Sequence, residues 1–121
     1  MRESDTDDPI QVYLREACTF PPLTIEEEND LSRHVLAQDG QAESAGLRLV
    51  EANLIQVVTI AQRHQSAGTH IVDLVQKGND GLLFALKTFA DCAEESFSSY
   101  AAQCIERAIS MAIAESRLTR E

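Results

Sequence analysis

Two aromatic side chains, Phe97 and Tyr100, stand three residues apart in the stretch FSSYAAQCIERAIS, which spans residues 97–110. Side chains at this spacing lie on the same face of a helix. Exposed rings on one face can stack flat groups such as nucleobases, whereas buried rings pack a helix onto a hydrophobic core. The sequence leaves both interpretations open for this pair.

A polar string, DLVQKGN at residues 73–79, carries a second set of groups that could bind a partner. Asp73 and Gln76 are three residues apart, so on a helix they would offer a carboxylate and an amide side by side to basic and amide groups of a partner helix. The alternative is that Asp73 is a solvated surface acid and that Asn79 only caps a helix. The string as a whole favours a binding face.

Histidine and cysteine are the remaining residue types that commonly form sites. The candidates are His34, His64, His70, Cys18, Cys92 and Cys104. No two histidines have the spacing that would present two metal ligands on one helix, and the cysteines lack metal-type spacing, so we expect surface histidines and free thiols. The sequence also contains no glycine-rich phosphate loop, catalytic triad or nucleophile motif. We therefore expect no cofactor, no small-molecule substrate and no enzymatic activity.

The chain has 121 residues, of which 44% are hydrophobic, which is enough for one core and too few for two ordinary domains. No stretch approaches the roughly 20 apolar residues of a membrane span, and the N-terminus lacks the apolar segment of a signal peptide. These features predict a single domain located in the cytoplasm, with no membrane partner.

The formal charge of −10 is unevenly distributed. Residues 1–30 hold nine acids and two bases, residues 31–89 hold five of each, and residues 90–121 hold six acids and three bases. Proteins that bind nucleic acid through its phosphates usually gather lysine and arginine on one face. The composition therefore argues against strong DNA binding.

Scarce proline and glycine, with apolar residues at helical spacing, predict an all-α fold, a compact bundle of about six helices. The first helix is expected to have Asp8 as N-cap and Pro9 in its first turn, and the proline pair of TFPPLT should end it. Thr24 and Glu27 form a capping box that opens a second helix, running to about Gln38.

The rest of the chain is expected to form four further helices. A central helix covers residues 45–65, and Gly68 can end it. A short helix containing DLVQKGN is closed by Gly78, and Asn79 can cap the next helix. After the polar loop ADCAEES, residues 90–96, the last helix follows with a clean apolar stripe.

Read in order, these segments resemble the primary-type sigma factors of bacterial RNA polymerase. The segment DPIQVYLREACTFPPLTIEEENDLSRHV (8–35) is similar to the helical segment that precedes region two of that family. The resemblance continues in LVEANLIQVVTIAQRH (49–64), DLVQKGNDGLLFAL (73–86) and FSSYAAQCIERAI (97–109). It covers nearly the whole chain and implies a sigma region-two domain, with residues 8–38 as an N-terminal helical pair and 45–118 as the core domain.

The resemblance implies that the chain binds core RNA polymerase through the coiled coil of its largest (β′) subunit. The positions that match the polymerase-binding surface are the polar Asp73, Gln76 and Asn79 and the apolar Leu74, Leu82 and Leu83.

The resemblance also implies a surface that melts the minus-ten promoter element, and here the chain departs from the family. Phe97 and Tyr100 are retained, but Gln103 and Cys104 stand where the family has tandem tryptophans. Stacking a base on an aromatic ring contributes roughly 1–3 kcal/mol, so two missing platforms matter. The implied DNA contacts are Phe97, Tyr100, Gln103 and Arg107, with weakened affinity.

The charges in which this chain differs from the family also predict weakened DNA binding. The family's basic loop is replaced by ADCAEES, Glu106 and Arg107 replace a base followed by glutamine, and the basic end of the central helix is reduced to Gln62, Arg63 and His64. Acids at these positions repel phosphates. Two functions remain open: a sigma factor that directs initiation, or an interaction module that binds polymerase as adaptor or competitor without melting DNA. A third interpretation is an acidic helical scaffold.

Overall fold

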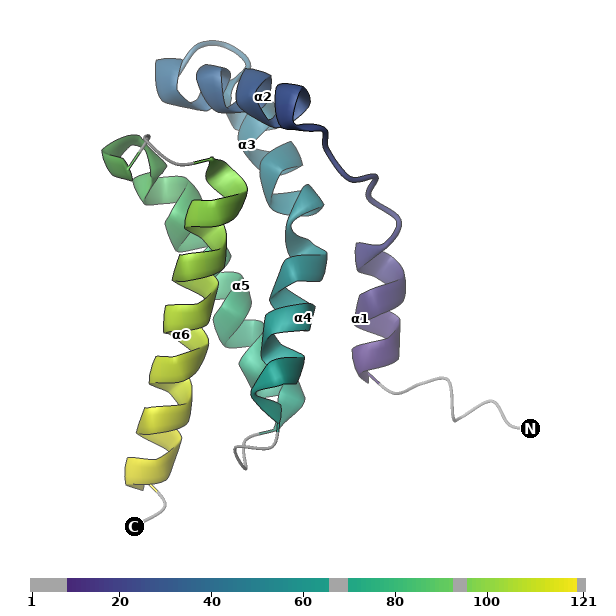
Figure 1. Cartoon of the computed structure of the whole chain (residues 1–121), viewed down its shortest axis with the longest axis vertical. Helices are drawn as coiled ribbons and strands as arrows, with labels where there is room; N and C mark the ends of the chain where they lie inside the picture. Colours follow the sequence, from purple (N-terminus) through teal and green to yellow (C-terminus); the bar gives the residue numbers. More distant parts are fainter. Residues whose placement is uncertain (1–8, 66–69, 93–95, 120–121) are drawn as a thin grey trace, which may run out of the picture.

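The computed structural model describes residues 9–65, 70–92 and 96–119, and these ranges are helical with no strand. Figure 1 shows α5 and α6 side by side, with α4 and α1 beyond them and α2 lying across one end of the molecule. None of the described helices has the length and hydrophobicity that crossing a membrane requires. The α-helices are α1 (Pro9–Ala17), α2 (Ile25–Ala37), α3 (Ala42–Ala52), α4 (Leu54–Arg63), α5 (Ile71–Thr88) and α6 (Phe97–Thr119), and a 3-10 helix, η3 (Phe89–Cys92), follows α5.

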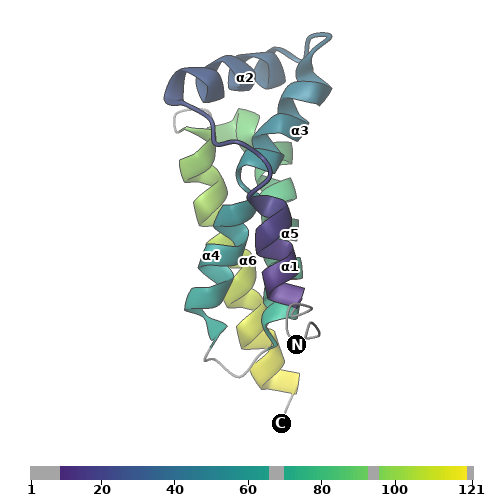
Figure 2. The ribbon, with the colours of Figure 1, turned by 90° about the vertical axis from the view of Figure 1, so that its right-hand side faces the viewer.

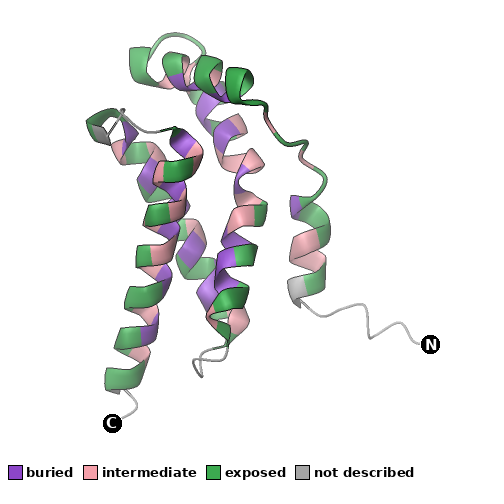
Figure 3. Cartoon of the chain, viewed as in Figure 1, coloured by how far each residue is buried: buried purple, intermediate pink, exposed green. Residues whose placement is uncertain are grey.

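The hydrophobic core lies between α4, α5 and α6, with α3 extending it towards α2. Figure 3 shows the buried positions of these helices facing one another and the exposed positions facing outward. α1 packs against α4 and α5, as the view in Figure 2 makes clear. The fully buried larger side chains include Leu49, Val57, Leu74, Leu82, Phe89, Phe97, Ile105 and Ile109.

The predicted capping box at the start of α2 is confirmed. The Thr24 hydroxyl accepts from the N–H of Glu27, and the Glu27 carboxylate accepts from the N–H of Thr24, both at 3.0 Å. α2 ends at Ala37, and Gln38 caps it in the left-handed conformation with φ of 52°. The expected N-cap at Asp8 and helix end at Gly68 lie outside the described residues, as does part of the predicted loop at 93–95.

The single central helix predicted for residues 45–65 is wrong, because α3 and α4 are separate helices that meet at Asn53. The Asn53 amide donates to the carbonyl of Leu49 at 2.8 Å and its side-chain oxygen accepts from Gln56 at 2.8 Å. A buried side chain that bonds the backbone in this way competes with the regular helical hydrogen bonds. The apolar stripe continues across this break, so periodicity did not reveal it.

The helix end predicted at Gly78 is also wrong, since α5 continues through Gly78 and Asn79 to Thr88. A Cβ added at Gly78 would lie 2.8 Å from Val57 Cγ1, and one at Gly81 would lie 2.7 Å from the carbonyl oxygen of Cys104. These glycines therefore allow α4 and α6 to approach α5 closely. They mark helix contacts in this chain, although glycine more often marks a helix end.

Candidate functional site

One side of α5 presents the residues expected to bind a partner. Asp73 and Gln76 are exposed, and Leu83 keeps 54% of its surface exposed although it is apolar. Gln76 and Leu83 are two helical turns apart, which places them on the same side of the helix. Leu74 and Leu82 are fully buried, so they hold α5 to the core and do not form part of its outer surface.

Asn79 is neither exposed like Asp73 and Gln76 nor fully buried like Leu74 and Leu82. It is half-buried, and its side-chain amide donates a hydrogen bond to the hydroxyl of Tyr13 on α1. The Asn79 Oδ1 atom is buried without a hydrogen-bond partner among the described residues. The hydrogen bond of Asn79 therefore links α1 to α5. The sequence did not indicate this role, because 66 residues separate Asn79 from Tyr13.

The aromatic pair at the start of α6 belongs largely to the core. Phe97 is fully buried and meets Phe89 edge to face, with 5.4 Å between ring centroids. Tyr100 is half-buried, lies 6.2 Å from the Phe89 ring, and shares a 2.6 Å hydrogen bond with the hydroxyl of Thr88. Because Phe97 is buried in the core, it cannot stack a base, and its position fits the interpretation that it packs the helix onto the core. Of the two rings, only Tyr100 has an exposed surface that a base could contact.

The remaining predicted DNA contacts, Gln103 and Arg107, lie on the exposed side of α6. Their neighbour Glu106 faces His64 at the end of α4, with 2.6 Å between Nε2 and Oε2. The imidazole of His64 thus contacts a carboxylate of the same chain. Arg63 remains as an exposed cation at that end of α4. The structure brings few cations to this surface.

The start of α6 is joined to α2 by a carboxylate. Glu28 keeps only 9% of its surface exposed. Its carboxylate accepts hydrogen bonds from the backbone N–H and the hydroxyl of Ser98, both at 2.8 Å. The first N–H groups of a helix have no partner within it, and a carboxylate there is favoured by the helix dipole. Of the acids in α2, the sequence indicated a role only for Glu27, in the capping box, and it gave no sign of this contact of Glu28.

The histidines have structural partners. The Nδ1 atom of His70 accepts from the N–H of Val72 and caps α5, while His34 contacts Asp39 at 2.7 Å. In the part of the chain that the structure describes, no group of three or more histidine, cysteine or acidic side chains could hold a metal ion. Cys18 and Cys104 are free thiols.

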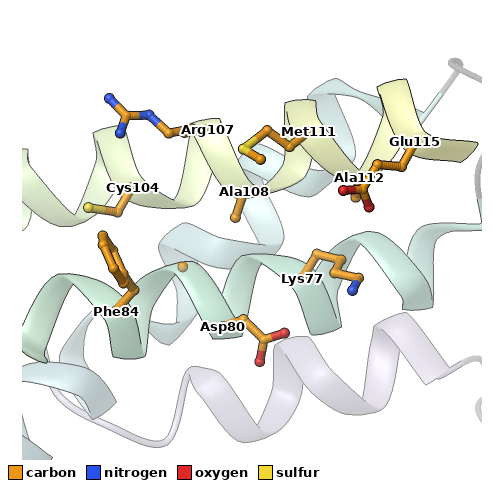
Figure 4. A pocket seen from close by; sticks show the side chains of 10 residues that line it. Lys77, Asp80, Phe84, Cys104, Arg107, Ala108, Met111, Ala112 and Glu115 are labelled. Atoms are coloured by element: carbon orange, nitrogen blue, oxygen red, sulfur yellow. The ribbon is translucent and has the colours of Figure 1, made fainter.

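A groove between α5 and α6 was not predicted from the sequence. It encloses about 430 Å³, and Figure 4 shows Phe84 and Cys104 towards one end and Lys77 and Glu115 towards the other. Phe84 falls outside the apolar stripe of α5 and remains 53% exposed. The signal that would have found it is the helical period, because Phe84 follows Leu82 by two residues and so lies on the opposite side of any helix that contains both.

Comparison with known proteins agrees with this architecture. The family model described as Sigma-70 region 2 matches residues 49–119. A protein named RNA polymerase sigma factor SigA from Lactococcus lactis subsp. cremoris is 40% identical over 113 residues, which is 93% of this chain and 31% of that protein. Proteins of the same name from Clostridium acetobutylicum and Listeria monocytogenes are 42% and 40% identical over the same length, each with 29% of the relative covered.

The chain thus spans about three-tenths of the length of these relatives. The matched region begins at Leu49 in α3 and takes in all of α4, α5 and α6, which form the core and carry both surfaces described above. With more than half of its residues matched by the family model, the chain belongs to the sigma-70 family of sigma factors, and residues 49–119 are its region 2.

Proposed function

We propose that this chain is a non-enzymatic, sigma-type transcription initiation protein that binds core RNA polymerase, and that the exposed side of α5 docks on the coiled coil of the β′ subunit. The observation that carries the proposal is the arrangement of Asp73, Gln76 and Leu83 on one side of a well-anchored helix. A carboxylate, an amide and an apolar side chain on one helix face suit an amphipathic partner helix.

The anchoring of α5 supports the same proposal. Leu74 and Leu82 fix the helix from the core side, and the Asn79–Tyr13 hydrogen bond fixes it from α1. A surface held by rigid packing loses little conformational entropy on binding, which favours affinity. Asn79 then contributes by positioning α5, and Asp73 and Gln76 supply the direct polar contacts.

A photo-crosslinking experiment tests the docking face. A photoreactive amino acid replaces Gln76, the chain is mixed with core RNA polymerase, and the crosslinked peptide is identified by mass spectrometry. We expect a crosslink to the β′ coiled coil. The matched control carries the same group at Arg33, an exposed position on α2. Crosslinks from position 76 that map to another subunit, or equal labelling from both positions, would contradict the proposal.

A binding measurement complements the crosslink. Asp73→Ala with Gln76→Ala should weaken binding to core polymerase, since polar contacts to a partner are lost. Asp30→Ala with Gln62→Ala is the matched control, because it removes the same two residue types from exposed positions elsewhere. Binding that changes equally in both variants would show that α5 has no special role.

A second candidate function is an adaptor or competitor that occupies polymerase without opening promoter DNA. It is favoured by the burial of Phe97 and by the pairing of Glu106 with His64, which leave few groups to hold flipped bases or phosphates. Permanganate reactivity of promoter thymines separates the two functions. Reactive thymines with core polymerase plus this chain would exclude the second candidate, whereas polymerase binding without reactivity would favour it.

A further inference from the structure

The α5–α6 groove has the composition of an interaction surface. Its floor is formed by small residues, among them Gly81, Ala108 and Ala112, and its rims carry the apolar side chains of Phe84 and Met111, which are 53% and 55% exposed. Leu83 adjoins Phe84 and is 54% exposed. Apolar side chains gathered in this way, and rimmed by charged residues, mark protein interaction sites.

The charges on the two walls follow a self-complementary order. The helices are antiparallel, because Gly81 lies beside Cys104 and Ala108, whereas the earlier α5 residues Asp73 and Lys77 line a hollow with the later α6 residues Ala112 and Glu115. From the Phe84 end, the α5 wall carries the acid Asp80 and then the base Lys77. In the same direction, the α6 wall carries a base and then an acid, Arg107 and Glu115.

These four charged groups have no ion-pair partner within the described residues. Since each wall carries one acid and one base, the groove is neutral and selects neither an acidic nor a basic partner as a whole. The groove can instead bind selectively a surface that places a base opposite each of its acids and an acid opposite each of its bases.

We propose that a second copy of this chain occupies the groove. A two-fold axis running along the groove places the α5 wall of each copy against the α6 wall of the other. Asp80 then meets Arg107 of the second copy, and Lys77 meets Glu115 of the second copy. Such an interface is isologous, so each pair of contacts occurs twice.

The same rotation covers the apolar side chains. Phe84 on one wall is covered by the α6 wall of the second copy, and Met111 is covered by its α5 wall. The net charge of −10 on each copy opposes association at long range. At physiological ionic strength charges more than about 8 Å apart are largely screened, so the close opposite pairs decide the contact.

The groove adjoins the proposed polymerase-docking face, since Lys77 follows Gln76 and Phe84 follows Leu83 along α5. A dimer would therefore compete with polymerase for α5. The proposed dimer does not rest on the polymerase interaction, because it follows from the groove and its charges alone.

The test is sedimentation velocity of the whole chain over a wide concentration range. We expect a reversible monomer–dimer equilibrium. Asp80→Arg places like charges across both copies of the contact and should weaken the dimer by at least about tenfold. The combined Asp80→Arg, Arg107→Asp variant restores opposite charges and should recover it. Asp30→Arg, which makes the same charge change at an exposed position on α2, is the control and should leave the equilibrium unchanged.

A second pair keeps the test decisive if one variant fails to fold, as judged by circular dichroism. Lys77→Glu should weaken the dimer and Lys77→Glu with Glu115→Lys should restore it. A chain that stays monomeric at all concentrations would overturn the proposal, as would a dimer that Asp80→Arg and Asp30→Arg weaken equally, or one that neither double reversal recovers. A monomer whose polymerase binding is weakened by Phe84→Ala would assign the groove to polymerase and also overturn it.

Discussion

The carboxylate of Glu28 on α2 accepts both the backbone N–H and the hydroxyl of Ser98 on α6, each at 2.8 Å, across 70 residues of sequence. Through this contact α2 supplies a partner that the first turn of α6 lacks within its own helix. The position of α2 and the orientation of the α6 start are therefore coupled. Tyr100, which follows two residues later, depends on that orientation.

Removing the Glu28 carboxylate should destabilise the fold. Glu28→Ala leaves the N–H of Ser98 without its charged acceptor, and we expect the free energy of unfolding to fall by about 1.5–3 kcal/mol. Glu26→Ala is the control, because Glu26 is exposed in the same turn, and its effect should stay within about 0.5 kcal/mol. Urea denaturation measures both, and equal losses would contradict a specific role for Glu28.

The contact between His34 and Asp39 should be visible in the titration of Asp39. The hydrogen bond from His34, assisted by the N–H of Gln41, lowers the pKa of Asp39 from its ordinary value of 3.8. A depressed pKa in the folded state stabilises the fold above pH 3.8, and this contribution is lost as the pH falls through the lowered pKa.

Carboxyl-carbon NMR titration measures the pKa of Asp39 directly. His34→Ala should raise it towards 3.8, since the first cause of the shift is removed. Gln56→Ala serves as control because Gln56 bonds to Asn53 and not to the α2 terminus. An unchanged Asp39 titration in His34→Ala would show that the backbone N–H alone produces the shift.

Replacement of two glycines by alanine should change the stability of the protein differently. Gly81→Ala would place a Cβ 2.7 Å from the Cys104 carbonyl oxygen and 3.0 Å from the Ala108 Cβ, so α5 and α6 must separate. We expect a loss of about 1–3 kcal/mol in unfolding free energy. Gly40→Ala meets nothing within 4 Å and should be neutral or stabilising by up to about 1 kcal/mol. Thermal unfolding distinguishes them, and tolerance of Gly81→Ala would refute the close helix contact.

Substitutions at Phe97 and Tyr100 should separate the contribution of these rings to stability from a contribution to DNA binding. Phe97→Ala removes a fully buried ring and should cost about 3–5 kcal/mol in unfolding free energy. Tyr100→Phe keeps the ring and removes only the hydroxyl that shares a hydrogen bond with Thr88, so we expect about 0.5–1.5 kcal/mol. Phe97→Leu retains most of the buried volume, and its affinity for single-stranded promoter DNA should equal that of the unmodified chain. Lower affinity in a folded Phe97→Leu variant would restore a role for this ring in base contact.

The fold class and several helix ends could be predicted from the sequence because they depend on local chemistry. The Thr24–Glu27 capping box involves residues three apart, and the apolar stripe of α6 repeats with the helical period. Gly78 and Asn53 misled the prediction for the opposite reason. Whether a glycine ends a helix or admits a neighbour depends on tertiary packing, and a buried asparagine breaks a helix only where its side chain finds backbone partners.

The candidate site was predictable only in part. Asp73, Gln76 and Leu83 were identified through the resemblance to sigma factors, but the helix end predicted at Gly78 hid their place on one side of a single helix. The bonds of Asn79 to Tyr13 and of Glu28 to Ser98 join segments far apart in sequence, and no local pattern encodes them. The α5–α6 groove likewise depends on how two helices face each other, which requires the tertiary structure.

The antiparallel packing of α5 and α6 also bears on the order in which the protein folds. These helices follow one another in the chain, so their contacts close a short loop, whereas the hydrogen bonds that join α1 to α5 and α2 to α6 span 66 and 70 residues. Local contacts form faster because less chain entropy is lost before they are made. We expect the α5–α6 pair to form early in refolding. During synthesis α2 is made before the helix that contains Ser98, so Glu28 has to wait for the start of α6 before this contact can form.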